Sequence, residues 1–294
     1  MAEDGMKIRV HGCRGSQIGD AVGALCCYAY LRHLHPDAHT IWQVARKHLH
    51  AAPLFYENPL ISQLVISDAE EGYGPMDIAL AETCSIHFPL MPEHPEPHIP
   101  WPCVRNFYQE TFVMSGLTME QWNAVPEDIL RPRLHPWFII KRYPKTIAYW
   151  PCAAYGQTQI RRSRNASRPW AVSLVARLAA EGYNVVQFGH PKDYADCGGA
   201  LGCPDVRGLT FMEQIIASLG CDLVIGTDSG AGIAIGAYGH SQLTLLTDHF
   251  PGHTTNHLAF QPWNPNNRSF VGLGSADNIN VDEVVGVVHD IVKT

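Results

Sequence analysis

The chain of 294 residues is long enough for two domains of ordinary size. Hydrophobic residues make up 46% of it and charged residues 17%, which is typical of a globular protein with a sizeable core. Its formal net charge of -7 argues against a general binder of nucleic acid or of anionic membranes.

No apolar run reaches the length of a transmembrane helix. The acidic N-terminus leads directly into an expected strand, so we expect no signal peptide and a cytoplasmic location. In that compartment the nine cysteines are expected to be reduced thiols. The sixteen histidines do not form a metal-site pattern, and no metal is expected. The pair Cys197 and Cys203 leaves a metal site open as an alternative, although structural zinc pairs usually lie two to four residues apart.

Strands and helices alternate in the first half of the chain. A Gly-rich turn, residues 12–20, follows the first expected strand, and Pro36 ends the helix after it. Alternation of this kind predicts a parallel sheet. The expected strands are Lys7–Val10, Thr40–Val44, Gln63–Ser67 and Met76–Leu80, and the helix is Ala21–His33.

Two proline-rich stretches divide the middle of the chain. Six prolines between Phe88 and Pro102 indicate an extended or looped segment, and a helix is expected from Val104 to Met114. Four more prolines, from Pro126 to Pro144, indicate an interdomain linker. We therefore expect two domains, residues 1–140 and 141–294.

The second half begins again with a strand and continues in α/β alternation. Pro169 is expected at the first position of a helix and Gly182 just after its end. Thr210 and Glu213 form the pattern of a capping box. The expected strands are Thr146–Trp150, Asn184–Phe188 and Gln242–Leu246, and the expected helices are Trp170–Glu181, Phe211–Leu219 and Val281–Lys293.

The most informative stretch covers residues 222–239. An apolar strand, Leu223–Ile225, leads into the turn Gly226–Gly230 and then into a helix rich in Ala, Ile and Gly. The start of such a helix offers unpaired N–H groups and the positive end of a dipole, which suit a phosphate. The alternative is that Asp228 or Ser229 merely caps the helix.

Polar turns of both halves follow parallel strands, and ligands of open α/β sheets bind at the carboxyl ends of such strands. The second half supplies cations, Arg161–Arg168, together with a helix N-terminus, and this combination suits a diphosphate. The first half supplies Asp20 at the start of a helix, where a carboxylate suits a general base. We expect two Rossmann-like domains that face each other across a cleft.

The sequence resembles family 9 glycosyltransferases, the lipopolysaccharide heptosyltransferases and their relatives, which have the GT-B fold. Three matches carry the resemblance: Ser16–Asp20 after the first strand, Ser167–Trp170 before the helix that ends at Gly182, and Asp228–Gly230. The segments Arg207–Glu213 and Arg105–Leu117 match more loosely.

The resemblance implies a metal-independent, inverting sugar transfer without a cofactor, in which Asp20 is the general base. The absence of any D-x-D motif from the sequence agrees with a metal-independent reaction. Two positions depart from the family: Ile233 replaces an expected histidine, and Arg168 replaces a lysine, so a planar fork replaces a point charge.

The implied donor is a nucleotide-diphosphate sugar, with an ADP-sugar favoured, and the acceptor is a glycan, a lipid-linked or a protein hydroxyl. Donor-binding residues are expected to be Arg168, Gly189, His190, Lys192, Thr210, Asp228, Ser229 and Gly230. On the acceptor or phosphate side we expect Arg14, Ser16, Gln17, Gly19, Arg161 and Arg162.

Two other functions stay open from the sequence. A nucleotide-sugar epimerase on the same fold would need several cleft carboxylates and a histidine, for which Glu82, His87 and His190 are the only hints. A non-catalytic nucleotide-sugar binder is suggested by Ile233. Nucleic acid is not an expected partner of this protein under any of these functions.

Overall fold

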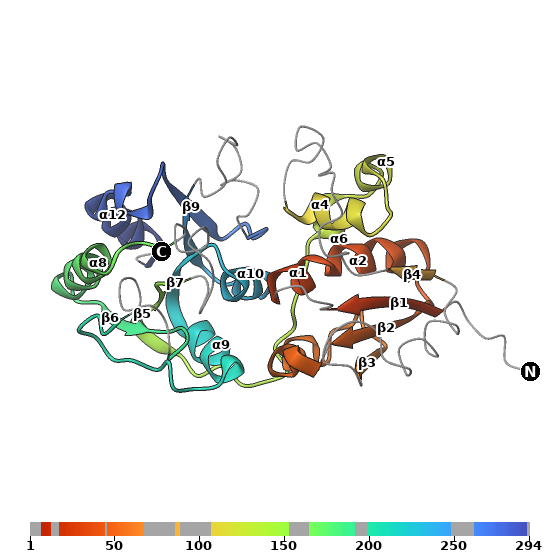
Figure 1. The fold of residues 1–294 in the computed structure, drawn as a ribbon, viewed down its shortest axis with the longest axis horizontal. Coiled ribbons are helices and arrows are strands. Elements are labelled where there is room, and N and C mark those ends of the chain that lie inside the picture. Colours follow the sequence, from red (N-terminus) through yellow and green to blue (C-terminus); the bar gives the residue numbers. More distant parts are fainter. Residues whose placement is uncertain are drawn as a thin grey trace, which may run out of the picture. The chain divides into compact units, whose positions relative to one another are not determined.

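The structure is a computed structural model that describes residues 7–12, 18–44, 46–67, 86–88, 107–152, 165–191, 199–247 and 262–292. The chain forms two compact units, Met1–Trp137 and Phe138–Thr294. Each is an α/β unit built on its own sheet (Figure 1). The sequence places this division after residue 140, within the same proline-rich segment.

The first unit is built on a parallel sheet of four strands in the order β3-β2-β1-β4. Counted along the chain this order is 3-2-1-4, which agrees with the start of the doubly wound arrangement. The strands are β1 (Lys7–Gly12), β2 (His39–Val44), β3 (Gln63–Ile66) and β4 (Ile86–Phe88). The helical elements are α1 (Ile18–Gly23), α2 (Leu25–Leu34), η1 (Arg46–Phe55), α4 (Phe107–Met114), α5 (Met119–Asn123) and α6 (Glu127–Leu130).

Helix α2 is the central helix of the first unit. All of its residues from Leu25 to Leu31 are buried. The hydroxyl of Tyr28 donates to the carbonyl of Ile41, which ties α2 to strand β2. On another side, the ring of Tyr30 meets that of Phe112 in α4 edge-on, with 5.3 Å between centroids. The helix is thus held between the sheet and the later helices by aromatic packing.

The second unit is built on a parallel sheet of five strands in the order β6-β5-β7-β8-β9. Counted along this unit the order is 2-1-3-4-5, so the direction of chain progression reverses between β5 and β7. Ligands of doubly wound sheets bind outside the carboxyl ends of the strands at such a switch point. The strands are β5 (Tyr143–Trp150), β6 (Asn184–Gln187), β7 (Cys221–Thr227), β8 (Gln242–Thr247) and β9 (Asn267–Gly272).

Helices cover both faces of this second sheet (Figure 1). Helices α8 (Arg168–Ala180) and α12 (Val281–Val292) share a core with Ile147, Leu223 and Leu243. On the other face lie α9 (Phe211–Gly220) and α10 (Gly230–Ala237), where the indole N–H of Trp150 donates to Ser218 Oγ at 3.0 Å. The short η3 (Ala276–Asn278) precedes α12.

Several expected elements differ in detail. The helix expected over Ala21–His33 is two helices that part at Ala24, directly after Gly23, a poor helix former. Pro169 is the second residue of α8, because Ser167 is the N-cap and accepts the N–H of Trp170. Six elements are not expected from the sequence, because their patterns are too short or too irregular to detect: η1, β4, α5, α6, β9 and η3. The expected strand Met76–Leu80 and the prolines from Pro89 to Pro102 lie outside the described residues.

Candidate functional site in the second unit

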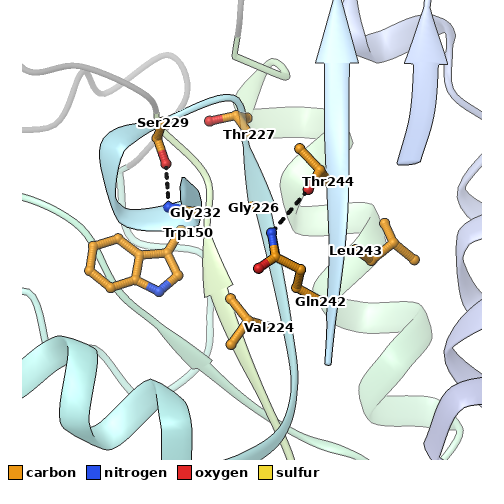
Figure 2. A pocket seen from close by; sticks show the side chains of 9 residues that line it. All are labelled: Trp150, Val224, Gly226, Thr227, Ser229, Gly232, Gln242, Leu243 and Thr244. Carbon is orange, nitrogen blue, oxygen red and sulfur yellow. Dashed lines mark hydrogen bonds between the residues drawn. The ribbon is translucent and has the colours of Figure 1, made fainter. Parts of the chain in front are cut away.

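The start of helix α10 lies at the carboxyl edge of the second sheet. Strand β7 is buried almost throughout and ends at Thr227. Ser229 is the N-cap: its backbone is extended, and its Oγ accepts the N–H of Gly232 at 3.1 Å (Figure 2). The first turn of α10 carries no acidic residue. Of the two alternatives, capping is therefore observed for Ser229, and it leaves further N–H groups of this helix end for an anion.

A small cavity lies beside this turn, between β7, β8 and the start of α10. It is lined by Trp150, Val224, Gly226, Thr227, Ser229, Gly232, Gln242, Leu243 and Thr244 (Figure 2). Its volume is about 10 Å³, which gives room for roughly one water molecule. This cavity is too small to hold a ligand of ordinary size.

The capping box expected at α9 is confirmed. Thr210 Oγ1 accepts the N–H of Glu213, and Glu213 Oε2 accepts both the N–H and the hydroxyl of Thr210. Hydrogen bonds from Thr210 lower the pKa of the Glu213 carboxyl below its usual value. A carboxylate of the chain thus already occupies this helix start, and Thr210 has no donor of its own left for a phosphate.

The turn after strand β6 carries Gly189 and the exposed His190. Gly189 has a φ of +133°, a conformation that favours glycine. Its N–H donates to Gln214 Oε1 at 2.8 Å, and Gln214 Nε2 donates to the carbonyl of Leu209 at 2.9 Å. Sequence reasoning missed Gln214, because one polar residue within an apolar helix face carries no recognisable motif.

Arg168 begins helix α8. Its guanidinium donates to the carbonyl of Ala200 from Nε at 3.3 Å and from one terminal nitrogen at 2.9 Å. The side chain is exposed, and the other terminal nitrogen makes no contact with Ala200. Arg168 therefore joins the start of α8 to the segment that leads to α9, with donor capacity to spare.

Asp20 is the third residue of α1 in the first unit, and Gly19 beside it is buried. The side chain of Asp20 lies outside what the structure describes. Six further expected site residues lie outside the described residues altogether: Arg14, Ser16, Gln17, Arg161, Arg162 and Lys192.

Three positions of the Asp228–Ile233 segment are buried. Asp228 is 5% exposed, Ala231 is 7% exposed and Ile233 is 6% exposed. Ile233, at the position where the resemblance implies a histidine, therefore packs as part of the core of this unit. Ser229, Gly230 and Gly232 of this segment are half-buried.

Among the described residues, no group of three or more His, Cys, Asp or Glu side chains is arranged to hold a metal ion. Cys203 is half-buried, and burial is the main cause that raises the pKa of its thiol. Its expected companion, Cys197, lies outside the described residues. Nor is any helix of the described parts both long and apolar enough to cross a membrane.

Comparison with solved structures identifies the class of fold. The chain is similar to E. coli ADP-heptose LPS heptosyltransferase II, with a TM-score of 0.71 and 16% sequence identity over 98% of this chain and 99% of that one. It is similar to a family 9 glycosyl transferase from Veillonella parvula, with a TM-score of 0.66 and 12% identity over 100% and 99% of the two chains. It is also similar to E. coli heptosyltransferase WaaC with ADP, with a TM-score of 0.53 and 11% identity over 97% of this chain and 99% of that one.

These similarities confirm, at the level of the fold, the resemblance that the short sequence motifs indicate. The chain has the α/β fold of the heptosyltransferases, with a parallel sheet in each unit. No protein family model matches the sequence. No curated protein matches it significantly either.

Proposed function

We propose that the chain is a glycosyltransferase that moves a heptose-like sugar from a nucleotide-diphosphate sugar to an acceptor hydroxyl. One observation carries the proposal: the start of α10 has a neutral Ser229 cap and no acid in its first turn, and it stands at the switch point of the second sheet. A diphosphate is the ligand that such a helix end favours. The heptosyltransferase fold supports the same conclusion.

In the proposed reaction, Asp20 takes the proton of the acceptor hydroxyl as its oxygen attacks the anomeric carbon of the donor. The bond from that carbon to the diphosphate oxygen breaks, and attack from the opposite face inverts the configuration. Arg168, Lys192 and the turn 228–230 stabilise the negative charge on the departing nucleotide diphosphate. Arg161, Arg162 and Arg14 add positive charge, and Ser16, Gln17, Gly189 and His190 shape the remaining surface.

Metal independence is part of the proposal and rests on the sequence, which has no D-x-D motif. Because Ile233 cannot donate to a phosphate, the backbone N–H groups and Ser229 carry more of the diphosphate binding than in a family member with histidine there. E. coli heptosyltransferase TibC, which has a related fold, has been solved in complex with ADP-D-beta-D-heptose. An ADP-sugar is therefore the first donor to test.

The test is a thermal-shift and calorimetric screen against ADP, UDP, GDP and TDP and their sugars. A ligand that binds the folded state raises its apparent stability by about 2.7 kcal/mol at one hundred times Kd. We expect one nucleotide to raise the melting temperature and to bind with one-to-one stoichiometry. A flat response to all of them would overturn the proposal.

Catalysis by Asp20 is tested by Asp20→Asn, with Asp37→Asn as an exposed control in the same unit. We expect Asp20→Asn to lose sugar transfer by at least about 100-fold, the size of a general-base contribution, and to keep donor binding. Epimerisation of a nucleotide sugar without any acceptor would instead favour the epimerase. Binding without turnover over an acceptor panel would favour the non-catalytic binder.

A further inference from the structure

Gln214 uses both ends of its side-chain amide to join two backbone segments. Its Oε1 accepts the N–H of Gly189 at 2.8 Å, and its Nε2 donates to the carbonyl of Leu209 at 2.9 Å. The side chain is only 4% exposed. Both polar atoms are therefore satisfied within the unit and shielded from water, where hydrogen bonds of an amide hold their geometry well.

The two joined segments differ in what they offer a nucleotide. Gly189 opens the turn that leads to the exposed His190, an expected donor-binding residue. Leu209 immediately precedes Thr210, whose N–H and hydroxyl are both taken up by Glu213, so this segment anchors the Gly189 turn and does not itself bind a phosphate.

Gly189 lies just after β6, and Leu209, twenty positions later in the sequence, lies just before α9. An isolated bridge between Gln187 and Asp205 already pairs the two segments nearby, where the carbonyl of Gln187 accepts the N–H of Val206 at 3.0 Å. Gln214 adds a side-chain link between the two turns themselves, beyond the end of that pairing.

The position would suit an apolar residue if only packing mattered. Its buried neighbours on α9 include Met212, Ile215 and Leu219. Placing an amide among them has a desolvation cost that the two hydrogen bonds have to offset. The amide therefore contributes the geometry of the two turns more than it contributes stability.

We propose that Gln214 is a positioning residue of the nucleotide-binding side, which sets the spacing of the Gly189 and Leu209 turns for the bound nucleotide. The inference rests on the proposed function, because it gives this spacing its purpose. Gln214 touches the two turns and acts through them, so its loss changes binding of the nucleotide before it changes the chemical step.

The test compares Gln214→Met with Asn264→Leu. Methionine has the length of glutamine and leucine the branching of asparagine, but neither can form the hydrogen bonds. Asn264 is a matched control in the same unit: it is 7% exposed, its Nδ2 donates to the carbonyl of His240 at 2.6 Å, and its Oδ1 accepts the N–H of Asn266 at 3.0 Å. Its partners lie before β8 and β9, at the amino ends of the strands.

We expect both variants to lower the melting temperature by similar amounts. Only Gln214→Met should raise the Kd for the nucleotide diphosphate and the KM for its sugar, by about tenfold, which corresponds to about 1.4 kcal/mol. Its kcat should stay within about threefold of the wild type. Gln214→Glu, which keeps the acceptor for Gly189 and loses the donor for Leu209, should recover part of the affinity.

Hydrogen exchange of the free protein provides a second measurement that needs no ligand. Amides around Gly189 and Leu209 should exchange faster in Gln214→Met and at the wild-type rate in Asn264→Leu. Wild-type affinity in Gln214→Met, or an equal loss of affinity in Asn264→Leu, overturns the positioning role. If the wild-type protein binds no nucleotide, both the proposed function and the role of Gln214 in nucleotide binding are overturned. If the amides near Gly189 exchange at the wild-type rate in Gln214→Met, only the positioning role of Gln214 is overturned.

Discussion

Glu213 Oε2 accepts two hydrogen bonds from Thr210, from its N–H at 2.8 Å and from its hydroxyl at 2.7 Å. This carboxylate fills the start of α9, where an anion would otherwise bind. The start of α8 has Ser167 as its cap, and Asp277 Oδ1 accepts the N–H of that serine at 2.6 Å. Helix α10 has the neutral hydroxyl of Ser229 at its cap and no acid in its first turn, and the buried Asp228 directly precedes the cap. The three helices thus differ in how far the chain itself satisfies their positive ends.

This difference predicts separate outcomes for two serine caps. Ser229→Ala and Ser167→Ala each remove an N-cap hydroxyl, and each should lower the free energy of unfolding by about 1 kcal/mol. Only Ser229→Ala should also weaken binding of the nucleotide diphosphate, by several-fold. Urea unfolding and calorimetry measure the two effects separately. Equal affinities of the two variants would mean that the start of α10 does not hold the ligand.

Alanine should change the stability of the fold differently at three helical glycines. A Cβ at Gly236 would lie 2.7 Å from Pro262 Cβ and 3.1 Å from Gln242 Oε1, so Gly236→Ala should destabilise the fold by about 1–3 kcal/mol. A Cβ at Gly232 would be in ordinary contact, 3.5 Å from Ser229 Oγ. Gly286 in α12 has open space around it, so Gly286→Ala should stabilise by up to about 1 kcal/mol.

Thermal and urea unfolding of the three alanine variants check this order. The free energy of unfolding of Gly232→Ala should lie between those of the other two variants. Alanine favours the helix at this position, and its Cβ would make only ordinary contacts. A stable Gly236→Ala variant would show that Pro262 and Gln242 move aside more easily than their packing indicates.

The elements that the sequence predicts well are those with strong local signals. Thr210 with Glu213, and Gly182 with a φ of +86°, follow from short-range chemistry and appear where expected. The second sheet follows from apolar runs bounded by glycine and proline. Strand β9 has only half-buried residues over most of its length, so its sequence lacks the apolar pattern of a central strand.

The candidate site was only partly predictable. Ser229 could be expected to cap α10 because residue type and position are sufficient for a cap. The contacts of Gln214 with Gly189 and of Arg168 with Ala200 join residues 25 and 32 positions apart. Such contacts depend on how the strands and helices pack, and a single sequence records neither the packing nor the register that produces them.

Two arginines of the same helix should separate ligand binding from surface ion pairing. Arg168→Ala should raise the Kd for the nucleotide diphosphate by about tenfold, since Arg–phosphate pairs are charge-assisted. Arg177→Ala removes exposed contacts with Asp282 and Glu181 and should leave the Kd unchanged. Calorimetry at two salt concentrations measures both. An unchanged Kd in Arg168→Ala would restrict Arg168 to its bonds with Ala200.

The buried His240 should make the stability of the second unit depend on pH. Burial, helped by the nearby positive charge of Arg142, lowers the pKa of His240 to about 4, against opposition from a backbone hydrogen bond of Cys221 and the charge of Asp222. The unfolded chain protonates this imidazole near pH 6.5, and the folded chain does so only near pH 4. The contribution of His240 is therefore fully present above about pH 6.5 and is lost as the pH falls toward 4, by up to about 3 kcal/mol.

Urea unfolding between pH 7 and pH 4 should show this loss in the wild type. His240→Gln cannot be protonated, so the free energy of unfolding of that variant should fall less over the same range, although it starts lower at pH 7. An NMR titration of the His240 ring in the folded protein measures the pKa directly. A ring that titrates near pH 6.5, with equal acid dependence in both proteins, would mean that the imidazole reaches solvent and contributes nothing to acid unfolding.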